Sequence, residues 1–305
     1  MDERAADAAR SRHRPAGAPA EPVAEKAPLR AACRICPHRC VLAEGAVGRC
    51  RARIARGGEV VPLNYGLITS LALDPIEKKP LARFHPGSTV LSVGSFGCNL
   101  SCPFCQNASI AQAGRDDVPW REVGPEGLVA QALGLRDAGC IGIAYTYNEP
   151  LVGYEFVRDC AALAHEAGLA NVLVSNGMIR SEPLRALAPL IDAANIDLKG
   201  FSQGFYDLVG GDYATARRTI ETLAALPTCH LEVTTLVIPG LNDDPAAVDE
   251  AARWLASLDP GITYHLTRFF PQHRMTDRPP TPIATLRRLA DAARRHLNDV
   301  LLGNC

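Results

Sequence analysis

The chain has 305 residues, of which 47% are hydrophobic, so it is long enough to bury one large core or two smaller ones. Its formal net charge of −1 gives no support to binding of nucleic acid or another polyanion. No apolar run approaches the roughly 20 residues that a membrane-spanning helix needs. Residues 1–30 lack the apolar segment of a secretion signal, so we predict a disordered leader and a cytoplasmic protein.

Residues 31–88 are rich in cysteine and glycine, and we expect a small N-terminal module followed by a linker. Four cysteines follow a C-x2-C-x3-C-x9-C pattern: Cys33, Cys36, Cys40 and Cys50. Four thiols close a zinc site or bind an iron–sulfur cluster, and this spacing matches neither common zinc pattern well. A metal-free set of thiols is the third possibility, and His38 is an alternative ligand. The proline-bracketed residues 74–88 are expected to cross to the main sheet as an extended loop.

From residue 89 onward, apolar strand-like runs alternate with helical patterns. Strands are predicted at 89–96, 140–147, 170–176, 193–199, 230–238, 263–270 and 300–303. Helices are predicted at 124–139, 151–168, 181–190, 213–226, 244–258 and 281–297, with Asp244 as the cap of the fifth. Six strand–helix units favour a parallel sheet, and a full barrel needs eight. We therefore predict an α/β fold in which residues 89–305 form a partial (β/α)6 TIM-like barrel, with an open doubly wound sheet as the alternative.

The first of these strands leads into "SFGCNLSCPFCQN", in which Cys98, Cys102 and Cys105 are spaced C-x3-C-x2-C. The proline after Cys102 disfavours helix, so the thiols are expected on a loop at the carboxyl end of the strand, the functional end of parallel α/β folds. Thiolates are ligands for zinc, copper(I) or iron–sulfur clusters. A [4Fe–4S] cluster normally takes four cysteines, so three leave one iron open for a chelating small molecule. A zinc site would instead need a distant fourth ligand such as His265.

This cysteine pattern, with Phe104 as the aromatic residue before the third cysteine, resembles the motif of the radical S-adenosylmethionine (radical SAM) superfamily. The resemblance implies a [4Fe–4S] cluster on the three cysteines, with S-adenosylmethionine chelating the open iron through its amino and carboxylate groups. One electron from the cluster then cleaves S-adenosylmethionine to a 5′-deoxyadenosyl radical, which abstracts hydrogen from a substrate. It also implies an electron donor such as flavodoxin or ferredoxin.

Other segments resemble the parts of this superfamily that bind S-adenosylmethionine. "YTYNEP" is similar to the Gly-Gly-Glu-Pro segment, with Asn148 and Glu149 in place of its second glycine and its glutamate. This implies that Glu149 accepts hydrogen bonds from the ammonium group, although both glycines of the family pattern are missing. "NIDLKGF" is similar to the Asp-x-Lys segment of glycyl-radical-enzyme activases, and Asp197 and Lys199 point to one face of their strand. Further candidates near strand ends are Ser175, Asn176 and His265.

Each of these side chains also has a simpler interpretation. An Asp–Lys pair is often a surface ion pair, Asn-Gly signals a turn, and a lone histidine is usually a core residue. Their shared position at predicted strand ends favours a common site. After the sixth strand, four residues either bind an acidic or polar substrate or belong to a solvated loop: Arg268, His273, Arg274 and Asp277. The isolated Cys140, Cys160 and Cys229 are expected to be buried apolar residues.

The order of these motifs over residues 33–305 looks like the radical SAM member of the AmmeMemoRadiSam system, a group related to pyruvate formate-lyase activating enzymes. This resemblance implies association with Memo-type and AMMECR-type proteins, and it implies no particular substrate. Three hypotheses follow. The chain is a radical SAM enzyme working with such partners, a glycyl radical enzyme activase that acts on a backbone glycine, or a non-catalytic zinc-binding interaction protein.

Overall fold

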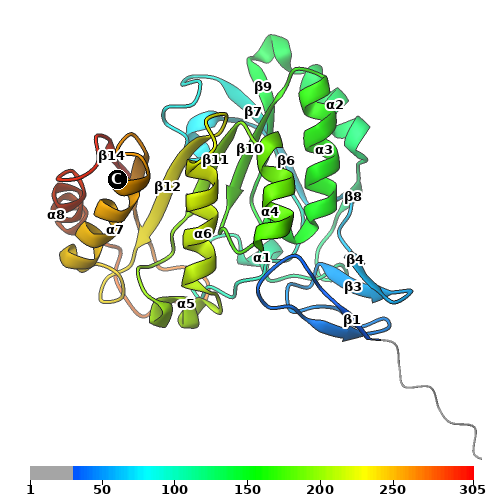
Figure 1. The fold of residues 1–305 in the computed structure, drawn as a ribbon, viewed down its shortest axis with the longest axis horizontal. Helices are drawn as coiled ribbons and strands as arrows, with labels where there is room; N and C mark the ends of the chain where they lie inside the picture. Colours follow the sequence, from blue (N-terminus) through cyan, green and yellow to red (C-terminus); the bar gives the residue numbers. More distant parts are fainter. Residues whose placement is uncertain (1–29) are drawn as a thin grey trace, which may run out of the picture.

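An eight-stranded sheet forms the body of the computed structural model, which describes residues 30–305 (Figure 1). Residues 1–29, where we predict a disordered leader, lie outside the described part. The parallel strands follow one another in chain order: β7 (Thr89–Gly94), β9 (Cys140–Tyr145), β10 (Ala170–Ser175), β11 (Ala193–Asp197), β12 (His230–Val237), β13 (Thr263–Arg268) and β14 (Val300–Gly303). This order never reverses, whereas a doubly wound sheet has a reversal point. The predicted partial barrel is confirmed, because the sheet is mostly parallel and its two edge strands, β6 and β14, are not paired with each other.

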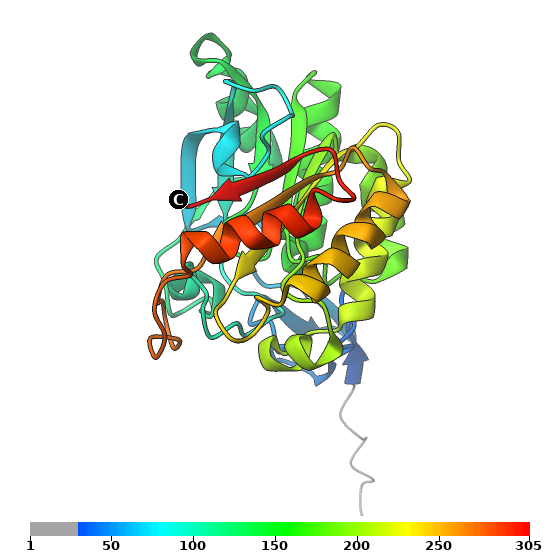
Figure 2. The ribbon, with the colours of Figure 1, turned by 90° about the vertical axis from the view of Figure 1, so that its left-hand side faces the viewer.

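Helices cover the outer face of this sheet, as Figure 1 shows for α2, α3, α4 and α6. The helices are α1 (Ala108–Ala111), α2 (Pro125–Leu133), α3 (Tyr154–Glu166), α4 (Ser181–Leu187), α5 (Gln203–Val209), α6 (Tyr213–Ala224), α7 (Pro245–Leu258) and α8 (Ile283–Ala293). Short 3₁₀ turns are η1 (Ile76–Lys78), η2 (Arg136–Ala138), η3 (Pro150–Gly153) and η4 (Ala188–Leu190). Figure 2 shows α7 and α8 beside the β14 edge. Within the described residues, no helix combines the length and apolar character needed to cross a bilayer.

Local sequence signals explain most helix boundaries. The Asp244 side chain accepts a hydrogen bond from the Ala246 N–H at 3.1 Å, so α7 begins where the cap predicts. The sequence prediction missed α5, although its signals are present. Ser202 accepts from the Phe205 N–H at the start, and Gly210 ends the helix with φ +74°.

The linker prediction was wrong in part, because residues 70–88 contribute to the barrel itself. β6 (Ser70–Pro75) pairs antiparallel with β7 along the sheet edge. The following turn then places Ile76 and Leu81, both fully buried, in one apolar cluster with strand residues such as Val90. An extended loop would have left these apolar side chains in water, so burial in the barrel interior favours the observed path.

The N-terminal module lies beneath the carboxyl ends of the parallel strands, the blue segment of Figures 1 and 2. Its short strands pair antiparallel: β1 (Arg30–Ala32) with β2 (Val41–Ala43), β3 (Arg53–Arg56) with β4 (Glu59–Pro62), and β5 (Leu67–Ile68) with β8 (Arg121–Glu122). Arg53 attaches the module to the barrel through a two-pronged ion pair with Glu155 of α3, at 2.6 and 2.7 Å. Such bidentate geometry fixes orientation as well as contact.

Candidate active site

The three-cysteine loop follows β7 directly and sits at the carboxyl end of the sheet. Gly97 gives the chain its turn with φ +90°, and its N–H donates to the Ile110 carbonyl. Cys102 is buried, whereas Cys98 and Cys105 are half-buried. All three thiols adjoin an apolar cluster that includes Phe104, Met178 and Phe205. The loop therefore presents its thiols at the edge of an apolar cluster.

The surroundings of these thiols favour the neutral thiol over the thiolate. Burial raises the pKa of Cys102 to about 12, and the nearby ammonium of Lys199 partly opposes this shift. Burial, then the charge of Glu149, raises the pKa of Cys98 well above its usual range. Bound metal reverses this balance by stabilising the thiolate.

The donor set itself fits an iron–sulfur cluster. It consists of three thiols, each of which would bind a different iron in a cluster. Among residues 30–305, including the N-terminal cysteines, no three possible ligands converge as closely as a single metal ion requires. A cluster does not need that convergence.

Asn148, at the end of β9, holds the start of the cysteine loop in place. Its side-chain oxygen accepts from the Ser95 N–H at 3.0 Å. Its amide nitrogen donates to the carbonyls of Phe96 and Gly97 at 3.1 and 3.0 Å. These bonds position the loop, and the predicted cofactor contact of Asn148 stays a prediction.

Glu149 is buried, and its carboxylate joins the ends of β9 and β10. One oxygen accepts from the Leu151 N–H at 3.0 Å and the Ser175 hydroxyl at 2.8 Å, and the other accepts from the Asn176 N–H at 2.8 Å. Burial raises the pKa of Glu149 to about 7, against the lowering effect of these hydrogen bonds. A ligand cation would therefore favour the ionised form of this carboxyl group.

Asn176 connects this carboxylate to the cysteine loop. Its side chain lies 3.6 Å from the Cys98 sulfur and donates to the Asn99 side-chain oxygen at 2.9 Å. Asn99 in turn donates to the Met178 carbonyl at 2.8 Å. The sequence prediction did not give Asn99 this role.

Asp197 and Lys199, at the end of β11, form an ion pair at 2.7 Å. Burial lowers the pKa of Lys199, but Asp197 and the neighbouring Cys102 outweigh it, and the net pKa lies above the usual range. Lys199 is close enough to lower the pKa values of Cys102 and Cys105. The pair therefore faces the cysteine loop, which a plain surface ion pair would not do.

His265 does not join these residues, contrary to the sequence prediction. It lies 2.5 Å from the buried carboxylate of Glu232, which also contacts His230 at 2.9 Å. The N–H groups of Ala82 and Arg83 also donate hydrogen bonds to this carboxylate, at 3.0 and 2.8 Å. His265 thus belongs to the contact between the linker and the early part of β12, because the strand register places it beside Thr234.

Acidification should release this carboxylate and destabilise the fold. Burial raises the pKa of Glu232, but hydrogen bonds from His230 and His265 outweigh it and lower the pKa from 4.5 to about 2. The resulting stabilisation is complete above pH 4.5 and is lost as the pH falls through 2, by about 2 kcal/mol after allowance for screening. Urea titrations of the wild type and Glu232→Gln at each pH measure the effect. We expect the variant to lose this pH dependence, and identical curves would contradict the assignment.

The charged residues after β13 divide between different contacts. Arg274 touches the cysteine loop, since its backbone N–H donates to the Pro103 carbonyl at 2.9 Å and its guanidinium donates to the Ser101 carbonyl at 3.2 Å. Arg268 donates to the Thr281 carbonyl at 2.8 Å, away from the loop. Asp277 pairs with its neighbour Arg278 at 3.0 Å. Of the four candidates, Arg274 is placed beside the cysteines by these bonds.

The sequence prediction missed a buried polar cluster around Tyr147. This residue has φ +70°, an unusual backbone conformation for a side chain of this size, and its hydroxyl donates to Asp74. Lys79, also buried, donates to Asp74 at 2.7 Å and lies 4.6 Å from the tyrosine ring centre. The charged residues of the "DPIEKK" segment were the available signal, and they gave no indication that Asp74 and Lys79 meet Tyr147.

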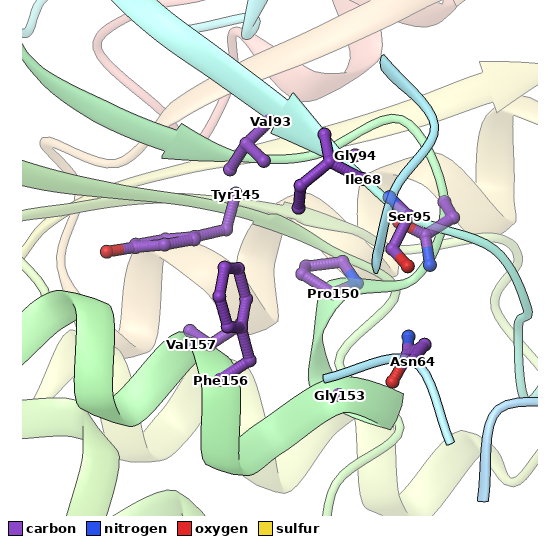
Figure 3. A pocket seen from close by; sticks show the side chains of 11 residues that line it. Asn64, Ile68, Val93, Gly94, Ser95, Tyr145, Pro150, Gly153, Phe156 and Val157 are labelled. Carbon is purple, nitrogen blue, oxygen red and sulfur yellow. Dashed lines mark hydrogen bonds between the residues drawn. The ribbon is translucent and has the colours of Figure 1, made fainter. Parts of the chain in front are cut away.

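A small cavity lies behind this end of the sheet, between β7, β9 and α3 (Figure 3). Tyr145, Phe156 and Val157 line its apolar side, and Asn64 faces it from the N-terminal segment (Figure 3). Its volume of about 30 Å³ suits one or two waters, so it is too small for S-adenosylmethionine.

The scattered cysteines behave as expected, since Cys140, Cys160 and Cys229 are all buried within the main core.

Together, the fold and the site place three thiols on the loop after the first parallel strand of a partial barrel. The family model of the radical SAM superfamily matches residues 92–255. The chain belongs to the radical SAM superfamily. Membership implies a [4Fe–4S] cluster and S-adenosylmethionine as cofactors, and it excludes the non-catalytic zinc-binding protein.

Known relatives agree with this assignment. The chain is 41% identical over 276 residues to the uncharacterized protein MJ0808 of Methanocaldococcus jannaschii, covering 89% of this chain and 80% of that protein. It is 28% identical over 156 residues to pyruvate formate-lyase 1-activating enzyme of Escherichia coli K12, covering 48% of this chain and 61% of that enzyme. The crystal structure of QueE from Escherichia coli matches with a TM-score of 0.51 at 13% identity, covering 79% of this chain and 94% of that one. This last similarity concerns the fold alone.

Proposed function

We propose that Cys98, Cys102 and Cys105 hold the catalytic cluster and that the ends of β9, β10 and β11 bind S-adenosylmethionine. When bound, these cofactors supply a 5′-deoxyadenosyl radical by one-electron reductive cleavage. Glu149 faces the ammonium group, and Asp197 and Lys199 bind further polar groups of the same molecule. The observation that carries the proposal is the set of hydrogen bonds from Asn148 and Asn176, which joins the ends of β9 and β10 to the cysteine loop.

The chain's own residues exclude water and fix geometry in this proposal. The apolar side chains of Phe104, Met178 and Phe205 shield the thiols from bulk solvent. These apolar side chains lower the local dielectric constant. A lower dielectric constant strengthens the attraction between the bound thiolates and charged groups such as Lys199. Asn148 and Asn176 hold the loop in place.

Anaerobic reconstitution tests this assignment. The protein is reconstituted with ferrous iron and sulfide, reduced with dithionite and incubated with S-adenosylmethionine, and 5′-deoxyadenosine is quantified. We expect product under anaerobic conditions and its loss after exposure to air, because the open iron is accessible to oxidants. Cys305→Ala, which removes an exposed thiol outside the loop, is the matched control and should behave as the wild type. Failure to assemble a cluster, or stable turnover in air, would contradict the proposal.

We propose further that the enzyme works in the reducing cytoplasm with Memo-type and AMMECR-type partners and takes its electron from flavodoxin or ferredoxin. The support is the order of motifs over residues 33–305 and eleven cysteines that are all free. A glycyl radical activase is the second candidate, supported by the 28% identity to pyruvate formate-lyase 1-activating enzyme. Adding each candidate partner to the reduced enzyme separates them. Memo-type and AMMECR-type proteins should raise 5′-deoxyadenosine formation, whereas an electron paramagnetic resonance (EPR) signal from a glycyl radical would select the activase.

A further inference from the structure

The four N-terminal cysteines line one pocket in the module beneath the strand ends: Cys33, Cys36, Cys40 and Cys50. Three of them are buried, and Cys40 is half-buried. The Cys33 N–H donates to the Cys40 carbonyl at 2.9 Å, which closes the first three cysteines into a compact turn. Arg39 and Arg51 adopt positive φ values of 46° and 63° next to Cys40 and Cys50. The backbone is thus bent twice to bring separate thiols to one space.

Two arginine residues lie beside these four thiols. Arg49 and Arg53 line the same pocket and bring positive charge to it. A centre bound by four thiolates carries net negative charge, which Arg49 would offset, whereas Arg53 is already paired with Glu155.

The module makes direct contact with the catalytic loop. The Cys98 N–H donates to the Cys50 carbonyl at 3.2 Å, so a ligand of one site is hydrogen-bonded to a candidate ligand of the other. The Nε2 atom of His38 donates to the Asn99 carbonyl at 2.8 Å, which is a second contact between the module and the cysteine loop. A Cβ atom on Gly97 would lie 2.4 Å from the Cys50 carbonyl oxygen, a measure of how closely the two segments approach.

We propose that Cys33, Cys36, Cys40 and Cys50 bind a second iron–sulfur cluster that passes electrons to the catalytic cluster. Four thiolates suit either zinc or an iron–sulfur cluster, but zinc is redox-inactive and cannot transfer electrons. The position favours a redox centre, because radical chemistry requires one electron for each cleavage and the second site touches the catalytic loop. A cluster also needs its ligands only around a common space, since each thiolate binds a different iron.

The electron balance of this relay is simple. A one-electron donor of the flavodoxin or ferredoxin class reduces the N-terminal cluster by one electron. That cluster is reoxidised as it reduces the catalytic cluster, and no bond is made or broken in either step. The relay rests on the proposed function and adds to it a path by which the electron reaches the catalytic cluster. The cleavage reaction itself is unchanged.

The first test removes the catalytic cluster and asks what remains. The triple variant Cys98→Ala/Cys102→Ala/Cys105→Ala is reconstituted anaerobically with ferrous iron and sulfide, with zinc measured in the same sample. We expect about two or four iron atoms per chain with matching sulfide, and an EPR signal after dithionite reduction. One zinc per chain without iron and sulfide would overturn the proposal. This readout does not depend on cleavage activity, so it can fail while the proposed function stands.

The second test addresses the relay. Cys36→Ala/Cys50→Ala should lose the residual cluster signal, and Cys305→Ala should keep it. In the double variant, we expect 5′-deoxyadenosine formation with reduced flavodoxin to fall at least tenfold relative to formation with dithionite, which reaches the catalytic cluster directly. Equal activity with both reductants would overturn the relay. If the double variant does not fold, the triple variant still shows whether the N-terminal cysteines bind iron and sulfide or zinc, because it leaves the N-terminal module intact.

Discussion

Cys102→Ala is expected to abolish formation of 5′-deoxyadenosine while leaving the fold in place. The variant removes one of three thiolates that hold the cluster, and the remaining two cannot keep three of its irons ligated. The side chain lies on a loop and is replaced by a smaller apolar group, so the cavity should lower the free energy of unfolding by only about 1 kcal/mol. Product assays on reconstituted protein, with iron content and thermal unfolding on the same sample, measure both effects.

Cys160→Ala provides a matched control for this substitution. Cys160 is also a buried free cysteine, but it lies in α3 and packs in the main core. It should lose similar stability and keep full activity. Normal cleavage by the Cys102→Ala protein would end the cluster assignment, and equal loss of activity in both variants would trace the effect to packing.

Glu149→Ala is expected to weaken binding of S-adenosylmethionine and also to destabilise the fold strongly. From the sequence alone, we predict a larger effect on the binding of S-adenosylmethionine than on the stability of the fold. The structure changes this balance, because the substitution leaves the Leu151 N–H, the Asn176 N–H and the Ser175 hydroxyl without their acceptor. Each unpaired buried donor costs about 1–3 kcal/mol, so we expect a total loss of about 2–4 kcal/mol as the site relaxes. Urea unfolding measures the stability, and calorimetric titration of the reconstituted protein measures the affinity.

The exposed Glu166, at the end of α3, supplies the control for a lost glutamate. Glu166→Ala should change the free energy of unfolding by less than about 0.5 kcal/mol and leave the affinity unaltered. Unchanged affinity in Glu149→Ala would count against its place in the cofactor site. Unchanged stability would contradict its role in joining β9 to β10.

The sequence by itself determined the features that depend on neighbouring residues. Alternating strand and helix patterns predicted the partial barrel, because burial on both faces gives parallel strands continuous apolar runs. Asp244 predicted the start of α7, since a cap contacts the first turn of its own helix. The spacing of Cys98, Cys102 and Cys105 placed three thiols on one loop, and the i, i+2 spacing of Asp197 and Lys199 put them on one face of a strand.

Only the tertiary structure decided which distant residues meet. His265 reaches Glu232 because the register between β12 and β13 places it opposite Thr234, two residues from Glu232 on the same face, and no local pattern encodes that register. The Cys50 carbonyl meets the Cys98 N–H across 48 positions of sequence, which only the packing of the module under the sheet brings together. Local periodicity reports which face of an element is buried. It carries no information on which residues pack against that face. The contacts between distant residues of this site are therefore set by the tertiary structure.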